Sequence, residues 1–136
     1  MSVDKRQTTN DKREKIQSFT DLRAWKEAHT FAIELYKATK QFPKDEMFAL
    51  TSQMRRSAVS VTSNIAEGYS RKTASDKEHF YVMARGSLSE LQSQLLIARD
   101  VGYMTVESFQ KLASQSVVAH KILNGLVNAT KEKLNG

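Results

Sequence analysis

The sequence predicts an all-α protein, an antiparallel up-down-up-down four-helix bundle, from two observations. Only 5 of the 136 residues are Gly and only 1 is Pro, which disfavours a sheet protein with many tight hairpins. Apolar residues also recur at three- and four-residue spacing over four long segments, and four such helices with short links pack as a bundle. We assign the bundle to residues 19–132 and a flexible, polar N-terminal tail to residues 1–18, which contain few apolar residues.

The first two helices are predicted over residues 21–41 and 45–70. Thr20 or Asp21 can cap the first, and Pro43 ends it because proline disfavours helical geometry in the residue before it. Acidic residues at the start of the second suit the positive end of the helix dipole. Its inward-facing seam has the spacing of a bundle helix: Met47, Leu50, Met54, Ala58, Val61 and Ile65.

The third and fourth helices follow after short links. Ser75 and Glu78 have the spacing of a capping box, and the third helix ends at Gly102, a natural residue for the left-handed position after a helix. The fourth runs from a Thr105 cap to about Lys131. The apolar residues of the third helix spread beyond one face, so we expect it to be covered on more than one side.

A second apolar stripe on the second helix predicts self-association. Phe48, Val59 and Ala66 fall about 120° from the seam on a helical wheel, where one core does not use them. Apolar patches left on a surface usually mark interfaces, so we expect a homo-oligomer. The alternative is that bundle helices are often broadly apolar.

Composition narrows the function classes. The net charge of +6 favours contact with polyanions, nucleic acid first. The absence of cysteine excludes disulfides and thiolate metal sites and favours the cytoplasm, and no apolar run is long enough for a membrane helix. His29, His79 and His120 lie on three different predicted helices, and no phosphate-cradling loop or nucleophile elbow is present. We therefore expect no metal, no cofactor, no catalytic residue and no enzymatic activity.

A polar row on the second helix is the most specific feature and has two interpretations. In the first, Ser, Asn and Glu side chains form a network that fixes helix register, and it consists of Ser60, Asn64, Glu67, Ser87 and Glu90. In the second, the cations bind nucleic acid, and they are Arg55, Arg56, Arg71 and Lys72. Glu67 and Glu90 can neutralise Arg71 and Arg56. The first interpretation is favoured for Asn64 and Glu67, and both stay open for Arg55, Arg71 and Lys72.

Several short motifs resemble those of the bacterial proteins encoded within 23S rRNA intervening sequences. The motifs are Asp21-Leu22 with Trp25, Phe42-Pro43 with Glu46, Gln53-Met54-Arg55-Arg56-Ser57-Ala58, Ser63-Asn64-Ile65-Ala66-Glu67-Gly68, Gly86-Ser87 with Glu90-Leu91, and Gly102-Tyr103. That family is related to the accessory variability proteins of diversity-generating retroelements. The resemblance implies a four-helix bundle that assembles into a ring, typically a homopentamer, with a basic surface suited to RNA or DNA and no enzymatic activity.

We therefore predict a non-enzymatic, oligomeric protein that binds nucleic acid, structured RNA in particular, through a basic surface. No RRM-type aromatic motif is present, so shape and charge should dominate over base reading. The alternative is a protein-interaction scaffold or accessory subunit whose oligomer recruits another protein and whose basic charge is incidental.

Overall fold

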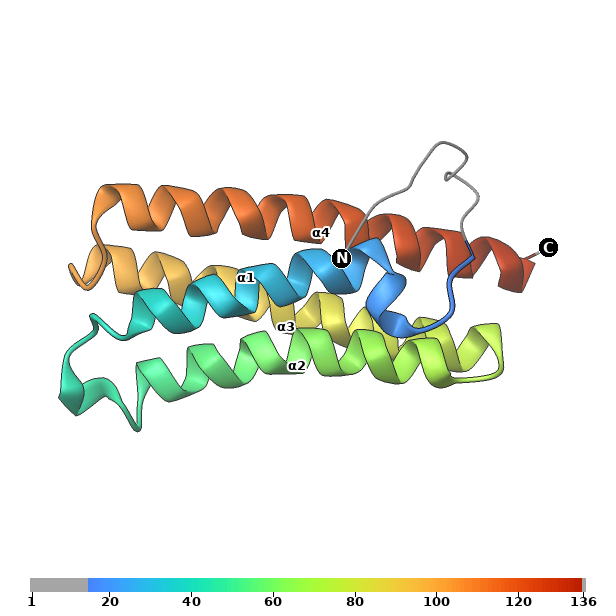
Figure 1. Cartoon of the computed structure of the whole chain (residues 1–136), viewed down its shortest axis with the longest axis horizontal. Coiled ribbons are helices and arrows are strands. Elements are labelled where there is room, and N and C mark those ends of the chain that lie inside the picture. Colours follow the sequence, from blue (N-terminus) through green and yellow to red (C-terminus); the bar gives the residue numbers. More distant parts are fainter. Residues whose placement is uncertain (1–14, 136) are drawn as a thin grey trace.

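The computed structural model describes residues 15–135, and no strand occurs among them. The long helices are α1 (Arg23–Thr39), α2 (Leu50–Ser70), α3 (Ala74–Asp100) and α4 (Val106–Asn135), with short 3-10 turns at η2 (Phe19–Asp21) and η3 (Lys44–Glu46). The four helices lie side by side, and the chain turns back at each link (Figure 1). The all-α, four-helix prediction is confirmed. Most of the predicted tail, residues 1–14, lies outside the described residues.

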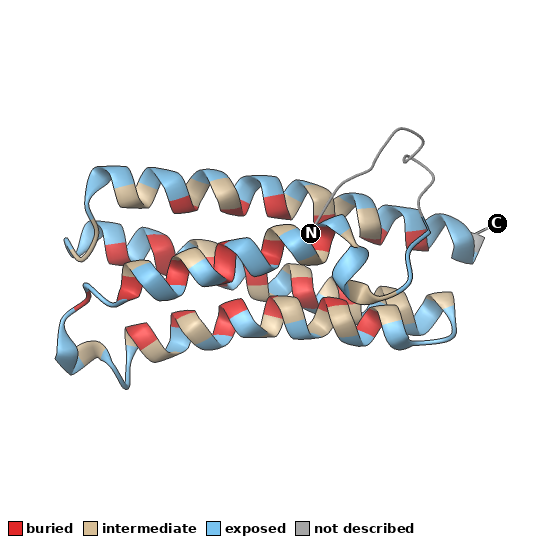
Figure 2. Cartoon of the chain, viewed as in Figure 1, coloured by how far each residue is buried: buried red, intermediate tan, exposed pale blue. Residues whose placement is uncertain are grey.

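Buried residues recur along each of the four long helices (Figure 2). The fully buried positions come from all four long helices and include Leu35, Met54, Ile65, Leu88, Leu91, Leu95, Leu123 and Val127. The third helix is covered on two sides, as expected, because α3 packs against both α2 and α4. Among residues 15–135, none of the helices combines the length and the hydrophobicity that a bilayer crossing requires.

The second helix begins five residues later than predicted. Residues 45–49 do not form its first turn, because η3 ends at Glu46 and Ala49 has φ −126° and ψ −108°. The Glu46 carboxylate instead accepts the N–H of Leu50, the first residue of α2, at 3.2 Å. Met47, predicted to lie in the core seam, therefore precedes the helix and is 41% exposed.

Two helix starts also differ from prediction. α1 begins at Arg23, and its N-cap residue Leu22 forms no side-chain cap bond, so neither Thr20 nor Asp21 caps this helix. Thr20 and Asp21 belong to η2, whose cap is Ser18, and the Asp21 carboxylate accepts the backbone N–H of Ser18 at 3.1 Å. Thr73, and not Ser75, caps α3, since its hydroxyl accepts the Asp76 N–H at 3.1 Å. Glu78 does not reach back to the cap and lies 3.9 Å from Lys131 of α4.

The α3–α4 link was predicted correctly. Gly102 has φ +83°, a left-handed conformation that glycine adopts without steric cost. The Gly102 N–H bonds to the Arg99 carbonyl and the Tyr103 N–H to the Ala98 carbonyl, which is a Schellman closure of α3. Thr105 caps α4 through the Ser108 N–H at 3.0 Å, and α4 continues to Asn135.

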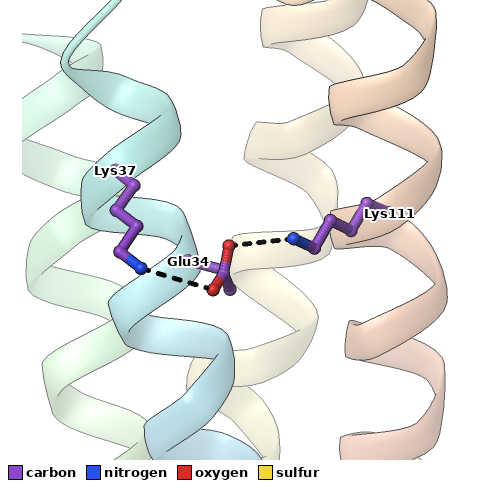
Figure 3. A network of polar contacts seen from close by, with 3 residues as sticks. All are labelled: Glu34, Lys37 and Lys111. Carbon is purple, nitrogen blue, oxygen red and sulfur yellow. Dashed lines mark hydrogen bonds and ion pairs between the residues drawn. The ribbon is translucent and has the colours of Figure 1, made fainter.

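An ion-pair cluster joins α1 to α4 on the surface (Figure 3). Glu34 accepts from Lys111 of α4 at 3.1 Å and lies 3.8 Å from Lys37 of its own helix. The hydrogen bond from Lys111, followed by its charge, lowers the pKa of Glu34. Exposed pairs of this kind add little stability, so the cluster orients the α1–α4 contact and the apolar core carries the fold.

Candidate nucleic-acid interface

Three of the five predicted network residues share hydrogen bonds, one of which crosses from α2 to α3. The Ser60 and Ser87 hydroxyls lie 2.8 Å apart across the two helices. The Asn64 side-chain amide donates to the Ser60 carbonyl at 2.9 Å and to the Ser60 hydroxyl at 3.1 Å. These bonds satisfy mid-helix polar groups, and the Ser60–Ser87 bond ties the register of α2 to that of α3.

Glu67 and Glu90 lie outside this hydrogen-bonded trio. Glu67 pairs with Arg71 one turn on, with an N–O distance of 2.7 Å, as the sequence indicated. Glu90 lines a hollow of about 400 Å³ on the α2–α3 face, together with Arg56 and Phe48. Within residues 15–135 Arg56 forms no ion pair with Glu90, and its guanidinium donates to the Ser52 hydroxyl at 3.3 Å.

Two of the predicted nucleic-acid contacts are engaged inside the chain. Arg55 bridges α2 to α1: its Nε donates to the Thr39 hydroxyl at 2.9 Å, and its guanidinium lies 4.7 Å from the centre of the Tyr36 ring. Arg71 lies over Phe80 at 4.6 Å besides its pair with Glu67. A guanidinium has five N–H donors, so both side chains keep donors for an incoming phosphate.

Lys72 lies in the link between α2 and α3, beside two lysines that the sequence analysis did not select. Lys72, Lys77 of α3 and Lys133 of α4 line a hollow of about 340 Å³ at this end of the bundle. Burial lowers the pKa of Lys77, and the positive charge of Lys133 lowers it further. No signal in the sequence could have grouped these lysines, because Lys133 is distant along the chain and only the packing of α4 against α3 brings it near.

The residues predicted for the oligomer interface do not form one stripe. Phe48 is 96% exposed, Val59 is 45% exposed and Ala66 is half-buried. Val59 and Ala66 belong to α2, whereas Phe48 precedes the helix, so the helical wheel does not apply to it. Phe48 lines the α2–α3 hollow with Arg56 and Ser60. Phe48 is therefore separate from the apolar positions Val59 and Ala66 on α2.

The histidines remain apart from one another. His29 stacks on Trp25 with ring centres 4.5 Å apart, His79 lies edge-on to Phe80, and His120 contacts the Asn124 amide at 3.3 Å. In the part of the chain that the structure describes, no three His, Asp or Glu side chains come together as a metal-binding group.

Comparison with known proteins identifies a family, and a crystal structure with the same fold is among the structural matches. The sequence model of a family described as 23S rRNA-intervening sequence protein matches residues 20–125. A crystal structure of a protein with unknown function from the S23 ribosomal protein family, from Bacteroides thetaiotaomicron, is similar at a TM-score of 0.72 and 20% identity. The alignment covers 77% of this chain and 95% of that one, and at this identity it shows the fold alone. No curated protein matches the chain.

Proposed function

Because the chain belongs to the 23S rRNA-intervening sequence protein family, we propose that it is a non-enzymatic, oligomeric protein that binds structured RNA in the cytoplasm through a basic surface. The family match over residues 20–125 carries this proposal. The net charge of +6 supports it, since polyanions attract a cationic surface and release counterions on binding. Binding of this kind reads the shape and charge of RNA rather than its bases.

The proposed contacts are Arg55, Arg56, Arg71 and Lys72. Arg56 and Lys72 are exposed and form no ion pair with any described residue, so they reach phosphates without breaking one. The Arg71 guanidinium would bind a phosphate while it remains paired with Glu67. Arg55 connects α2 to α1 through Thr39, and its remaining N–H donors would face the phosphate. Replacing Arg71 should therefore weaken binding with little effect on stability, whereas replacing Arg55 should weaken binding and also lower the melting temperature.

We propose that the antiparallel bundles assemble into a homopentameric ring. The exposed Phe48 ring supports an interface, because an aromatic side chain left in water costs free energy that burial against a second copy would recover. A ring would also bring the modest positive charge of each subunit together on one particle. Val59 and Ala66 are the other proposed contacts.

Affinity for an RNA hairpin as a function of salt tests the proposal. The logarithm of the association constant should fall linearly with the logarithm of salt concentration, and six to ten phosphate contacts would cost about a thousandfold or more between about 50 and 200 mM salt. Absence of binding at about 50 mM salt, or an affinity that does not change with salt, would contradict RNA binding through charge.

Phe48 also favours a second candidate, a scaffold that recruits another protein. Its almost complete exposure suits capture by any apolar partner groove, not only by a copy of this chain. Co-purification of a stoichiometric protein partner that survives nuclease treatment, together with loss of that partner in Phe48→Ser, would support the scaffold over RNA binding.

A further inference from the structure

Cationic side chains from three parts of the chain meet where α2 ends, α3 begins and α4 ends. Lys72 comes from the link after α2, Lys77 from the first turns of α3 and Lys133 from the last turn of α4. They line the hollow of about 340 Å³, which also includes Tyr81 and Thr130. We call this set the lysine pocket.

No carboxylate lines the lysine pocket, so its positive charge is not neutralised there. Two acids of the surrounding helices are engaged outside the pocket: Glu67 pairs with Arg71, and Glu78 lies 3.9 Å from Lys131. Burial lowers the pKa of Lys77, and repulsion from the charge of Lys133 lowers it further. Such repulsion costs free energy in the empty pocket, and an anion between the lysines would relieve it.

Lys77 is held in place by the end of α2. Its Nζ donates to the Tyr69 carbonyl at 2.7 Å and to the Gly68 carbonyl at 3.4 Å. An ammonium group has three N–H donors, so one remains for a ligand. Lys72 and Lys133 are exposed and can move toward a bound group. The pocket therefore has one fixed cation and two adjustable ones.

Tyr81 adds a neutral donor to the wall. It is only 3% exposed, and its hydroxyl forms no hydrogen bond with any of the described residues. Burial raises the pKa of Tyr81, so the phenol keeps its proton. Thr130 offers no such donor, because its hydroxyl donates to the Leu126 carbonyl at 2.8 Å.

We propose that the lysine pocket binds a phosphate group of the RNA backbone, with Lys72, Lys77, Lys133 and the Tyr81 hydroxyl as its donors. This proposal rests on RNA binding as the function, and it gives that function a specific location. It adds three residues, Lys77, Tyr81 and Lys133, to the contacts chosen from the sequence. The cations bind the phosphate, and the buried phenol selects for a group that can accept a hydrogen bond.

The test measures binding of a fluorescent RNA hairpin to the full chain and to two charge-matched double variants. Lys72→Gln/Lys133→Gln removes two pocket cations, whereas Lys40→Gln/Lys121→Gln removes two exposed lysines that do not line the pocket. We expect the pocket variant to bind about tenfold more weakly at about 100 mM salt, and the control to change by less than about threefold. Tyr81→Phe keeps the ring and should weaken binding by a smaller factor. Equal losses in the two double variants would overturn the proposal.

A second arm uses inorganic phosphate as the probe and separates the pocket from RNA binding itself. At constant ionic strength, phosphate should raise the melting temperature of the unmodified chain more than that of Lys72→Gln/Lys133→Gln. If the chain binds no RNA but phosphate still stabilises it through these lysines, the proposed function fails and the anion site stands. An equal rise in the melting temperature of both proteins would contradict the proposed anion site, even if RNA binding remains.

Discussion

The Tyr103 hydroxyl donates a hydrogen bond of 2.7 Å to the Glu46 carboxylate, 57 residues earlier in the chain. The other Glu46 oxygen accepts the first N–H of α2, from Leu50. Tyr103 itself directly follows Gly102, whose left-handed conformation ends α3. One carboxylate therefore ties the α1–α2 link to the α3–α4 link at the same end of the bundle.

Removing this hydrogen bond should destabilise the fold. Tyr103→Phe keeps the ring that packs on Phe42 at 5.5 Å and deletes only the hydroxyl, so the melting temperature should fall by a few degrees. The melting temperature of Glu46→Gln should fall further, because this change also weakens the hydrogen bond from the Leu50 N–H. In a double-mutant cycle the two losses should not add. Additive losses would show that the two groups act independently.

The same contact predicts a dependence on pH. The hydrogen bond from Tyr103, followed by that from the Leu50 N–H, lowers the pKa of Glu46 below 4.5. A carboxylate with a lowered folded pKa stabilises the protein above its unfolded pKa, and this contribution is lost as pH falls through the folded pKa. The difference in melting temperature between the unmodified chain and Tyr103→Phe should therefore shrink between about pH 6 and pH 3. Tyr36→Phe, which keeps the ring beneath Arg55, is the control and should show no such change.

Two helical glycines should respond to alanine in opposite directions. A Cβ on Gly68 of α2 would meet Tyr81 ring carbons at 2.6 and 2.8 Å and Phe80 Cβ at 3.2 Å, so Gly68→Ala should destabilise the bundle by about 1–3 kcal/mol. A Cβ on Gly125 of α4 would meet nothing within 4 Å, so Gly125→Ala should stabilise it by about 0.5–1 kcal/mol. Urea unfolding of both variants checks this. A stable Gly68→Ala would refute the close α2–α3 approach.

Phe48 should control self-association. Phe48→Ser removes the most exposed aromatic ring and should shift the protein toward smaller species, whereas Phe48→Leu keeps an apolar contact and should change assembly much less. Because Phe48 is 96% exposed in the single chain, neither variant should lower the melting temperature of a dissociated subunit. Sedimentation velocity over a range of concentrations measures the shift. If both variants sediment like the unmodified chain, the interface lies elsewhere.

Periodicity accounts for the part of the fold that the sequence could predict. Met54, Ile65 and Leu91 lie at seam spacing and are fully buried, because a helix that packs on one side must repeat its apolar residues with its turns. Ser60 and Ser87 were expected to meet because mid-helix serines on facing helices need partners, and they lie 2.8 Å apart.

Contacts between distant residues account for what could not be predicted. The late start of α2 depends on Glu46, whose partner Tyr103 belongs to another link. Arg55 bonds to Thr39 of α1 only because the helices pack in that register. Lys77 and Lys133 become neighbours through the α3–α4 contact, which helical periodicity does not predict. The Ser60–Ser87 contact could therefore be predicted from the sequence, whereas the grouping of Lys77 and Lys133 with Lys72 could not.

Size-exclusion chromatography with light scattering and the 260/280 nm absorbance ratio, on full chain purified without nuclease, tests the central claim most directly. We predict a particle of about five times the 15.4 kDa chain mass that carries nucleic acid at low salt and releases it as salt rises. A single 15.4 kDa species at high concentration, with the absorbance ratio of protein alone, would contradict the account.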